Sequence, residues 1–156
     1  MHNHGLGAWM TTRRQKTPDK TALVFDGQST TYRALADDTD RISAVLGRRG
    51  IGIGDAVAFL GENSPEFLSV MFACAQLGAI FVPVNTRLAP PEVTHVLTDS
   101  RARALIASIP EAERSLFALR LDGITYEREG NLLRSRGDLD AAVDPLWRSN
   151  ALRQQI

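Results

Sequence analysis

The chain of 156 residues is poor in cysteine and lysine, and it has no excess of either charge sign. Its one cysteine, Cys74, cannot form an internal disulfide, which excludes a disulfide-stapled secreted domain and favours a reducing compartment. Only Lys16 and Lys20 are lysines, which excludes lysine-based chemistry in the rest of the chain. Eighteen basic residues balance eighteen acidic ones, so no overall field attracts nucleic acid.

Long apolar runs are also few, although hydrophobic residues make up 44% of the chain, as in a globular protein. Residues 1–5 lack the basic and apolar segments of a signal peptide. Residues 67–84 form one stretch of membrane-like length, but Gln76, Gly78 and Pro83 divide it into a helix and a strand. We therefore expect buried core here, no transmembrane segment and a cytoplasmic protein.

Helix and strand signals alternate along the first two thirds of the chain. The patterns predict helices at residues 6–15, 32–49, 65–77 and 90–97, and strands at 22–25, 29–31, 56–60, 79–83 and 104–107. Thr31 and Ser64 are predicted N-caps, and Gly50 and Gly78 are predicted helix stops. This alternation predicts an α/β fold with a largely parallel sheet, in which residues 79–83 form a buried strand.

The pattern weakens beyond Ser108. A helix at residues 110–121 and a short strand at 123–127 are the only further elements predicted, and no period is clear near the end of the chain. We therefore divide the chain into an N-terminal subdomain, residues 1–108, and a divergent C-terminal tail, residues 109–156, whose order, in part or not at all, the sequence leaves open.

Few side chains have the pattern of metal ligands or nucleophiles. His2 and His4 lie near the terminus, where a frayed tail is favoured over a metal site. His95 follows two prolines on an amphipathic helix and is expected at its surface. Cys74 lies between alanines, which favours a buried structural thiol over a nucleophile.

The glycine-rich segment at residues 50–54 superficially suggests a dinucleotide-binding loop. Such a loop follows a strand and opens a helix, whereas this segment follows a predicted helix and opens a strand. We therefore interpret it as a connection. Asp55 and Glu66 are likewise interpreted as turn and cap residues rather than acid–base groups.

Four short motifs occur in order between residues 17 and 107. Residues 30–35 contain a Thr-Tyr-x-x-Leu helix start, and residues 75–85 contain Leu-Gly-Ala followed by Val-Pro and asparagine. Between them lie Gly-Asp-Ala-Val-Ala at 54–58 and Asn-Ser-Pro-Glu-Phe at 63–67. Each motif alone is weak, but their order and spacing resemble the N-terminal part of the adenylate-forming (AMP-binding) enzymes, most closely the fatty-acyl-CoA ligases.

The resemblance implies a fold, an activity and one binding residue. The fold would be the first part of the N-terminal domain of an acyl-CoA synthetase, and the activity ATP-dependent formation of an acyl-adenylate and then a CoA thioester. The full-length family uses ATP, Mg²⁺ and CoA. In its Asn-x-Arg-Leu loop a basic residue lies near the CoA entrance, so Arg87 is implied to contact a CoA phosphate. An exposed arginine that caps a nearby helix end remains the alternative, and Asn85 is expected to bind its own loop backbone.

Several motifs of the family are missing from this sequence. No Ser/Thr/Gly-rich segment ends in Pro-Lys-Gly to hold the ATP phosphates, and no Tyr-Gly-x-Thr-Glu motif follows. The ribose-binding aspartate and the catalytic lysine of the C-terminal domain are absent as well. Residues 142–145 resemble the linker before the phosphate loop, and the family pattern is lost after Pro145. We therefore expect a truncated or frameshifted ligase that is inactive alone, with no catalytic residue, metal ligand or cofactor of its own.

A non-catalytic binding module is the alternative from another class of protein. Such a module would dock on a full-length ligase or on a complementing chain, and co-purification with that chain would identify it. Apolar surface around residues 67–84 would otherwise favour self-association.

Overall fold

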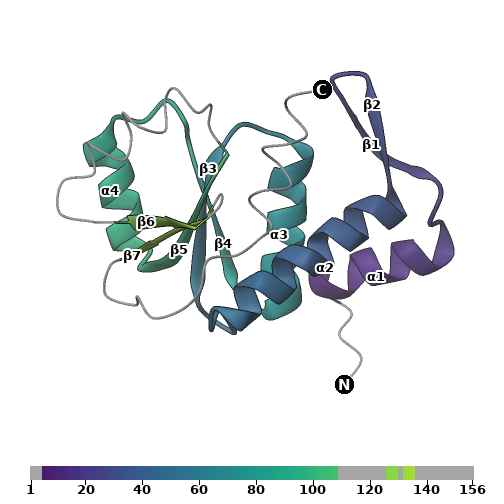
Figure 1. Ribbon diagram of the computed structural model, residues 1–156, viewed down its shortest axis with the longest axis horizontal. Helices are drawn as coiled ribbons and strands as arrows, with labels where there is room; N and C mark the ends of the chain where they lie inside the picture. Colours follow the sequence, from purple (N-terminus) through teal and green to yellow (C-terminus); the bar gives the residue numbers. More distant parts are fainter. Residues whose placement is uncertain (1–4, 109–125, 130–131, 136–156) are drawn as a thin grey trace. The chain divides into compact units, whose positions relative to one another are not determined.

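The computed structural model describes residues 5–108, 126–129 and 132–135 (Figure 1). The chain divides into two compact units. The first comprises residues 1–57 and 63–81, and the second comprises residues 58–62 and 82–156. Each unit has its own buried apolar cluster.

The first unit contains three helices and a hairpin. These are α1 (Leu6–Lys16), β1 (Thr21–Phe25), β2 (Gln28–Thr31), α2 (Tyr32–Arg48) and α3 (Pro65–Leu77). The strands β3 (Ala56–Gly61) and β4 (Ile80–Val84) begin in this unit. The helices and strands predicted over this part of the chain are confirmed, with bounds that differ by one or two residues.

Local capping explains where the helices of this unit begin and end. The hydroxyl of Thr31 accepts from the backbone N–H of Ala34 at 3.2 Å, and that of Ser64 accepts from Phe67 at 3.2 Å. Gly78 ends α3 with a φ of 69°, a left-handed conformation that costs glycine little. The predicted N-caps and this predicted stop are therefore confirmed.

The core of the first unit joins its three helices. Met10, Leu35, Ala36 and Phe72 form a buried cluster. The ring of Trp9 stacks on Phe72 with centroids 5.3 Å apart. Helix α1 has almost no apolar stripe of its own, so these few contacts must supply most of its docking energy.

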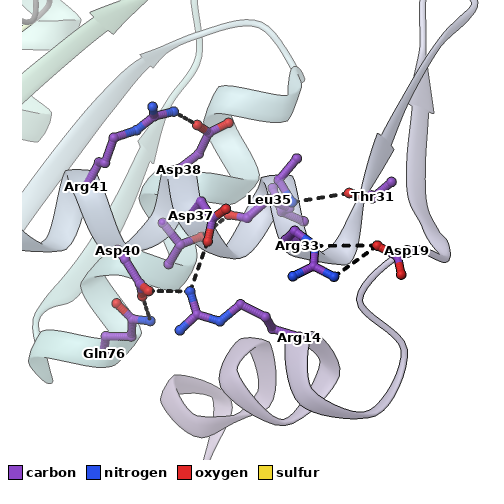
Figure 2. Close-up of polar contacts among 12 residues, drawn as sticks. Arg14, Asp19, Thr31, Arg33, Leu35, Asp37, Asp38, Asp40, Arg41 and Gln76 are labelled. Carbon is purple, nitrogen blue, oxygen red and sulfur yellow. Dashed lines mark hydrogen bonds and ion pairs between the residues drawn. The ribbon is translucent and has the colours of Figure 1, made fainter.

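A polar network joins the same three helices (Figure 2). The guanidinium of Arg14 on α1 donates to Asp40 at 2.7 Å and to Asp37 at 3.0 Å, both on α2. The side-chain amide of Gln76 on α3 donates to the other oxygen of Asp40 at 2.9 Å. The hydrogen bond to Asp40 and then that to Asp37 raise the pKa of Arg14. Asp40 is therefore the shared acceptor that links α1, α2 and α3.

Replacing Asp40 by alanine should lower the free energy of unfolding by about 1–2 kcal/mol, because Arg14 and Gln76 each lose an acceptor. Asp38 is a matched control on the same helix, since its side chain is 41% exposed against 43% for Asp40 and, among the described residues, it forms an ion pair with Arg41 alone. Asp38→Ala should cost about 0.5 kcal/mol or less. Equal losses in urea unfolding of the two variants would contradict the role of Asp40.

The second unit is built on a five-stranded sheet with the strand order β4-β3-β5-β7-β6. The strands β4, β3 and β5 (Ala102–Ser108) run parallel, which confirms the predicted α/β fold with parallel strands. The strand β7 (Leu132–Ser135) pairs antiparallel with β5 and with β6 (Tyr126–Glu129). Helix α4 (Pro90–Asp99) packs on the sheet (Figure 1). The buried cluster consists of Ala58, Leu60, Val84, Val93, Leu97, Leu105 and Ala107.

The sheet corrects one prediction and extends another. The strand predicted at residues 79–83 is not buried throughout, because Ile80 is 54% exposed and Pro83 is exposed. As β4 is an edge strand, one side of its backbone has no neighbouring strand among the described residues, a position that tolerates proline. The strand predicted at 123–127 is found at Tyr126–Glu129, with residues 123–125 outside the described part. The strand at Leu132–Ser135 had not been predicted.

Two predictions fall on residues that are not described. The helix predicted at 110–121 lies outside the described residues, and the division of the chain at Ser108 stays a prediction. No helix in the described ranges is long and apolar enough to cross a membrane.

Candidate functional site

Ligands of parallel α/β sheets bind beyond the carboxyl ends of the strands. In the second unit these ends carry Glu62 after β3, the loop at residues 85–89 after β4, and Ser108 at the end of β5. A Cβ atom on Gly61 would lie 2.7 Å from the ring of Phe59 and 3.0 Å from Cβ of Ser108. The ends of β3 and β5 are therefore tightly packed, and the loop after β4 offers the more open polar surface.

The backbone of this loop is held by Asn85. Its side-chain oxygen accepts from the N–H of Arg87 at 3.0 Å, and its carbonyl oxygen accepts from the N–H of Leu88 at 3.2 Å. Leu88 packs against the buried cluster of the second unit. The prediction that Asn85 binds its own loop is confirmed, and the loop is anchored on both sides of Arg87.

The side chain of Arg87 is exposed. Within the described part of the chain, its guanidinium forms no ion pair and no hydrogen bond with another side chain. The structure thus places a cationic group on a fixed loop, at the carboxyl end of a strand. Its contact with a CoA phosphate stays a prediction.

The N-terminus of α4 follows this loop and offers no backbone donor to an anion. The N–H of Ala89 donates to the carboxylate of Glu92 at 2.7 Å, and Pro90 and Pro91 have no N–H. The N–H groups of Glu92 and Val93 donate to the carbonyl oxygen of Ala89 at 2.9 and 3.1 Å. An anion at the start of α4 would therefore have to bind a side chain, and Arg87 lies two residues before the cap.

The other residues considered from sequence have structural positions. The carboxylate of Asp55 accepts from the N–H of Gly52 at 2.9 Å, as expected of a turn residue. Glu66 lies in the first turn of α3, and His95 is exposed on α4. No three His, Cys, Asp or Glu side chains of the described residues gather to hold a metal ion. His2 and His4 lie outside the described residues.

Cys74 is fully buried in α3, and burial raises the pKa of its thiol from 9.0 to about 12. The prediction of a buried structural thiol is confirmed. A thiol that stays protonated in the folded chain is a poor nucleophile at neutral pH.

This shifted pKa predicts a loss of stability in alkali. Above pH 9 the unfolded chain releases the thiol proton of Cys74 and the folded chain keeps it until about pH 12. For each pH unit above 9, the folding equilibrium constant of the wild type should therefore fall by about tenfold more than that of Cys74→Ala, which lacks the thiol. Urea unfolding of both proteins at several pH values above 9 measures the difference. Parallel pH profiles of the two proteins would contradict the expectation.

The fold agrees with the comparisons of this chain with known proteins. The family model of the AMP-binding enzymes matches residues 10–147. The chain therefore belongs to the AMP-binding enzyme family, as the sequence motifs predicted.

Curated relatives are considerably longer than this chain. A feruloyl-CoA synthase from Amycolatopsis sp. is 42% identical over 145 residues, which cover 92% of this chain and 28% of the relative. The long-chain-fatty-acid–CoA ligase FadD13 from Mycobacterium tuberculosis is 44% identical over 82 residues, or 53% of this chain and 16% of the relative. The chain thus spans less than a third of the length of either relative.

Solved structures show the same fold. An artificially fused adenylation–PCP didomain, NpsA-ThdA from Klebsiella oxytoca, matches 67% of this chain and 20% of its own, with 36% identity and a TM-score of 0.63. VinN in complex with 3-methylaspartate matches 74% of this chain and 31% of its own at 23% identity, with a TM-score of 0.66, and shows the fold alone.

Proposed function

We propose that the protein acts in the ATP-dependent activation of a carboxylic acid. The carboxylate would attack the α-phosphorus of ATP, giving an acyl-adenylate and pyrophosphate. The thiol of CoA would then displace AMP to give the thioester. The observation that supports this proposal is the 42% identity to feruloyl-CoA synthase over 92% of the chain.

The proposed acid is a fatty acid. The 44% identity to a long-chain-fatty-acid–CoA ligase over 82 residues supports it. An aromatic acid is the second candidate, because the match to feruloyl-CoA synthase covers more of the chain. Thioester formation by a longer protein that contains this segment, assayed with long-chain fatty acids and with ferulate, separates the two. We expect turnover of the fatty acids, and turnover of ferulate alone would overturn this assignment.

The proposed CoA contact is made by Arg87. Its exposed guanidinium, the fixed loop and the occupied cap of α4 support this role. A guanidinium can donate two parallel hydrogen bonds to one phosphate. In a longer protein that contains this segment, Arg87→Ala should raise KM for CoA by about tenfold and leave KM for ATP unchanged. Arg41→Ala, which removes an arginine of the first unit, is the charge-matched control. An equal rise in KM for CoA in that variant would contradict the contact between Arg87 and CoA.

The 156-residue chain by itself is proposed to be inactive in adenylation. Its sequence has no Pro-Lys-Gly phosphate segment and no lysine after Lys20, so the chain alone is proposed to bind neither ATP nor Mg²⁺ productively. A non-catalytic module that docks on a longer ligase or on a complementing chain is the alternative. A cytoplasmic location belongs to the same proposal and is supported by the single, buried cysteine.

Self-association is a further part of this proposal. Ile53 is 92% exposed and Ile80 is 54% exposed in the first unit, which leaves apolar surface for another chain to cover. Sedimentation of the chain over a range of concentrations tests it. We expect a reversible dimer, and a monomer at every concentration would overturn self-association.

A further inference from the structure

We infer that Asn85 is a positioning residue that holds Arg87 for a phosphate group of CoA, an inference that rests on the proposed CoA contact. The side-chain oxygen of Asn85 lies 3.0 Å from the backbone nitrogen of Arg87. That hydrogen bond restrains the backbone at the residue that carries the guanidinium. Asn85 itself is not proposed to touch the ligand.

The restraint is useful because Arg87 is exposed and has many rotamers. An arginine side chain loses much conformational freedom when it is fully fixed, and a mobile backbone would add to that loss. Asn85 on one side and the packed side chain of Leu88 on the other fix the backbone before any ligand binds. Binding then orders the side chain alone.

Where this loop leads into α4, the backbone offers no free N–H that could hold an anion. The N–H of Ala89 is bound to Glu92, and the two prolines that follow have none. In many helices the free N-terminal donors would bind a phosphate without help from a side chain. In this loop the affinity for phosphate should depend on Arg87 and on the residue that positions it.

The experiment is a titration of the 156-residue chain with CoA, followed by NMR of the backbone amides. The wild type should bind CoA in the millimolar range and ATP more weakly. We expect Arg87→Ala to weaken CoA binding by about tenfold and Asn85→Ala by about threefold. Asn85→Ser retains an oxygen acceptor and should keep most of the CoA affinity that Asn85→Ala loses. Thr86→Ala changes an exposed neighbour in the same loop and should bind like the wild type.

A second readout separates positioning from general stability. In Asn85→Ala the amide hydrogen of Arg87 should exchange faster with solvent, while the unfolding midpoint stays that of the wild type. In the double variant with Arg87→Ala, the substitution of Asn85 should cost no further affinity, because its effect acts through Arg87.

The outcomes distinguish the inference from the proposed function. If Arg87→Ala does not weaken CoA binding, or if the wild type does not bind at millimolar CoA, the proposed contact is wrong and the inference falls with it. If Arg87→Ala weakens binding and Asn85→Ala does not, the contact stands and the positioning role of Asn85 is overturned. Equal losses for CoA and ATP in the Arg87→Ala variant would show a general phosphate site and overturn the assignment to CoA.

Discussion

Replacing Leu105 by alanine is expected to destabilise the second unit by about 2–5 kcal/mol, because the lost side chain leaves a cavity in a closed core. Leu105 lies on β5, between β3 and β7 in the sheet, and none of its side chain is exposed. It belongs to the buried cluster with Val93 and Leu97 of α4. The cavity would therefore open between the sheet and the helix that packs on it, where the surrounding backbone can collapse only in part.

Urea unfolding of the variant measures this loss. Val24→Ala removes an apolar side chain that is 64% exposed, and it should change stability by about 0.5 kcal/mol or less. A loss for Leu105→Ala as small as that of Val24→Ala would show that the cluster around β5 is not a packed core.

Replacing Gly7 by alanine is the second substitution that we expect to destabilise the folded chain strongly. A Cβ atom at this position would lie 2.5 Å from the carbonyl oxygen of Ala75 and 3.0 Å from its carbonyl carbon. Because the clash is with backbone atoms of α3, no side chain can turn away to relieve it. Helix α1 would have to move off α3, at a cost of about 1–3 kcal/mol.

Gly47 provides the matched control within a helix. A Cβ atom there would lie 3.7 Å from the nearest atom outside the helix, which is Cδ2 of Leu77 and an ordinary contact distance. Gly47→Ala should therefore stabilise the chain by about 0.5–1 kcal/mol, since alanine is the better helix former. Thermal unfolding of both variants shows whether each substitution raises or lowers the stability. Stabilisation by Gly7→Ala would contradict the close approach of α1 to α3.

The helices were predictable from sequence because their ends are set locally. Ser64 and Pro65 start α3, and Gly78 ends it, all through backbone geometry within a few residues. The same holds for Asn85, whose side chain binds the backbone two residues away. Signals of this range can be read from one sequence without knowing the fold.

Contacts between distant residues could not be predicted in this way. Asp40 and Gln76 are 36 positions apart in the sequence, and nothing in either neighbourhood indicates their hydrogen bond. The tight approach of Gly7 to Ala75 is equally invisible, because a glycine in a polar helix looks like a weak helix former. Exposure of Ile80 depends on the edge position of β4, which the order of strands decides.

The candidate site was predictable in part. Asn85 and Arg87 were found because the loop resembles a family motif, and the structure adds how the loop is held. The occupied cap of α4 needed the structure, since it depends on the carboxylate of Glu92 turning back to Ala89.

ATP–pyrophosphate exchange by the purified 156-residue chain tests the central claim most directly. The assay would use magnesium, long-chain fatty acids and ferulate, with a longer member of the family as the positive control. We expect no exchange above the blank, because the residues that would hold the ATP phosphates are not in this sequence. Exchange that depends on both the acid and the chain would show that these residues adenylate by themselves and would contradict the proposal.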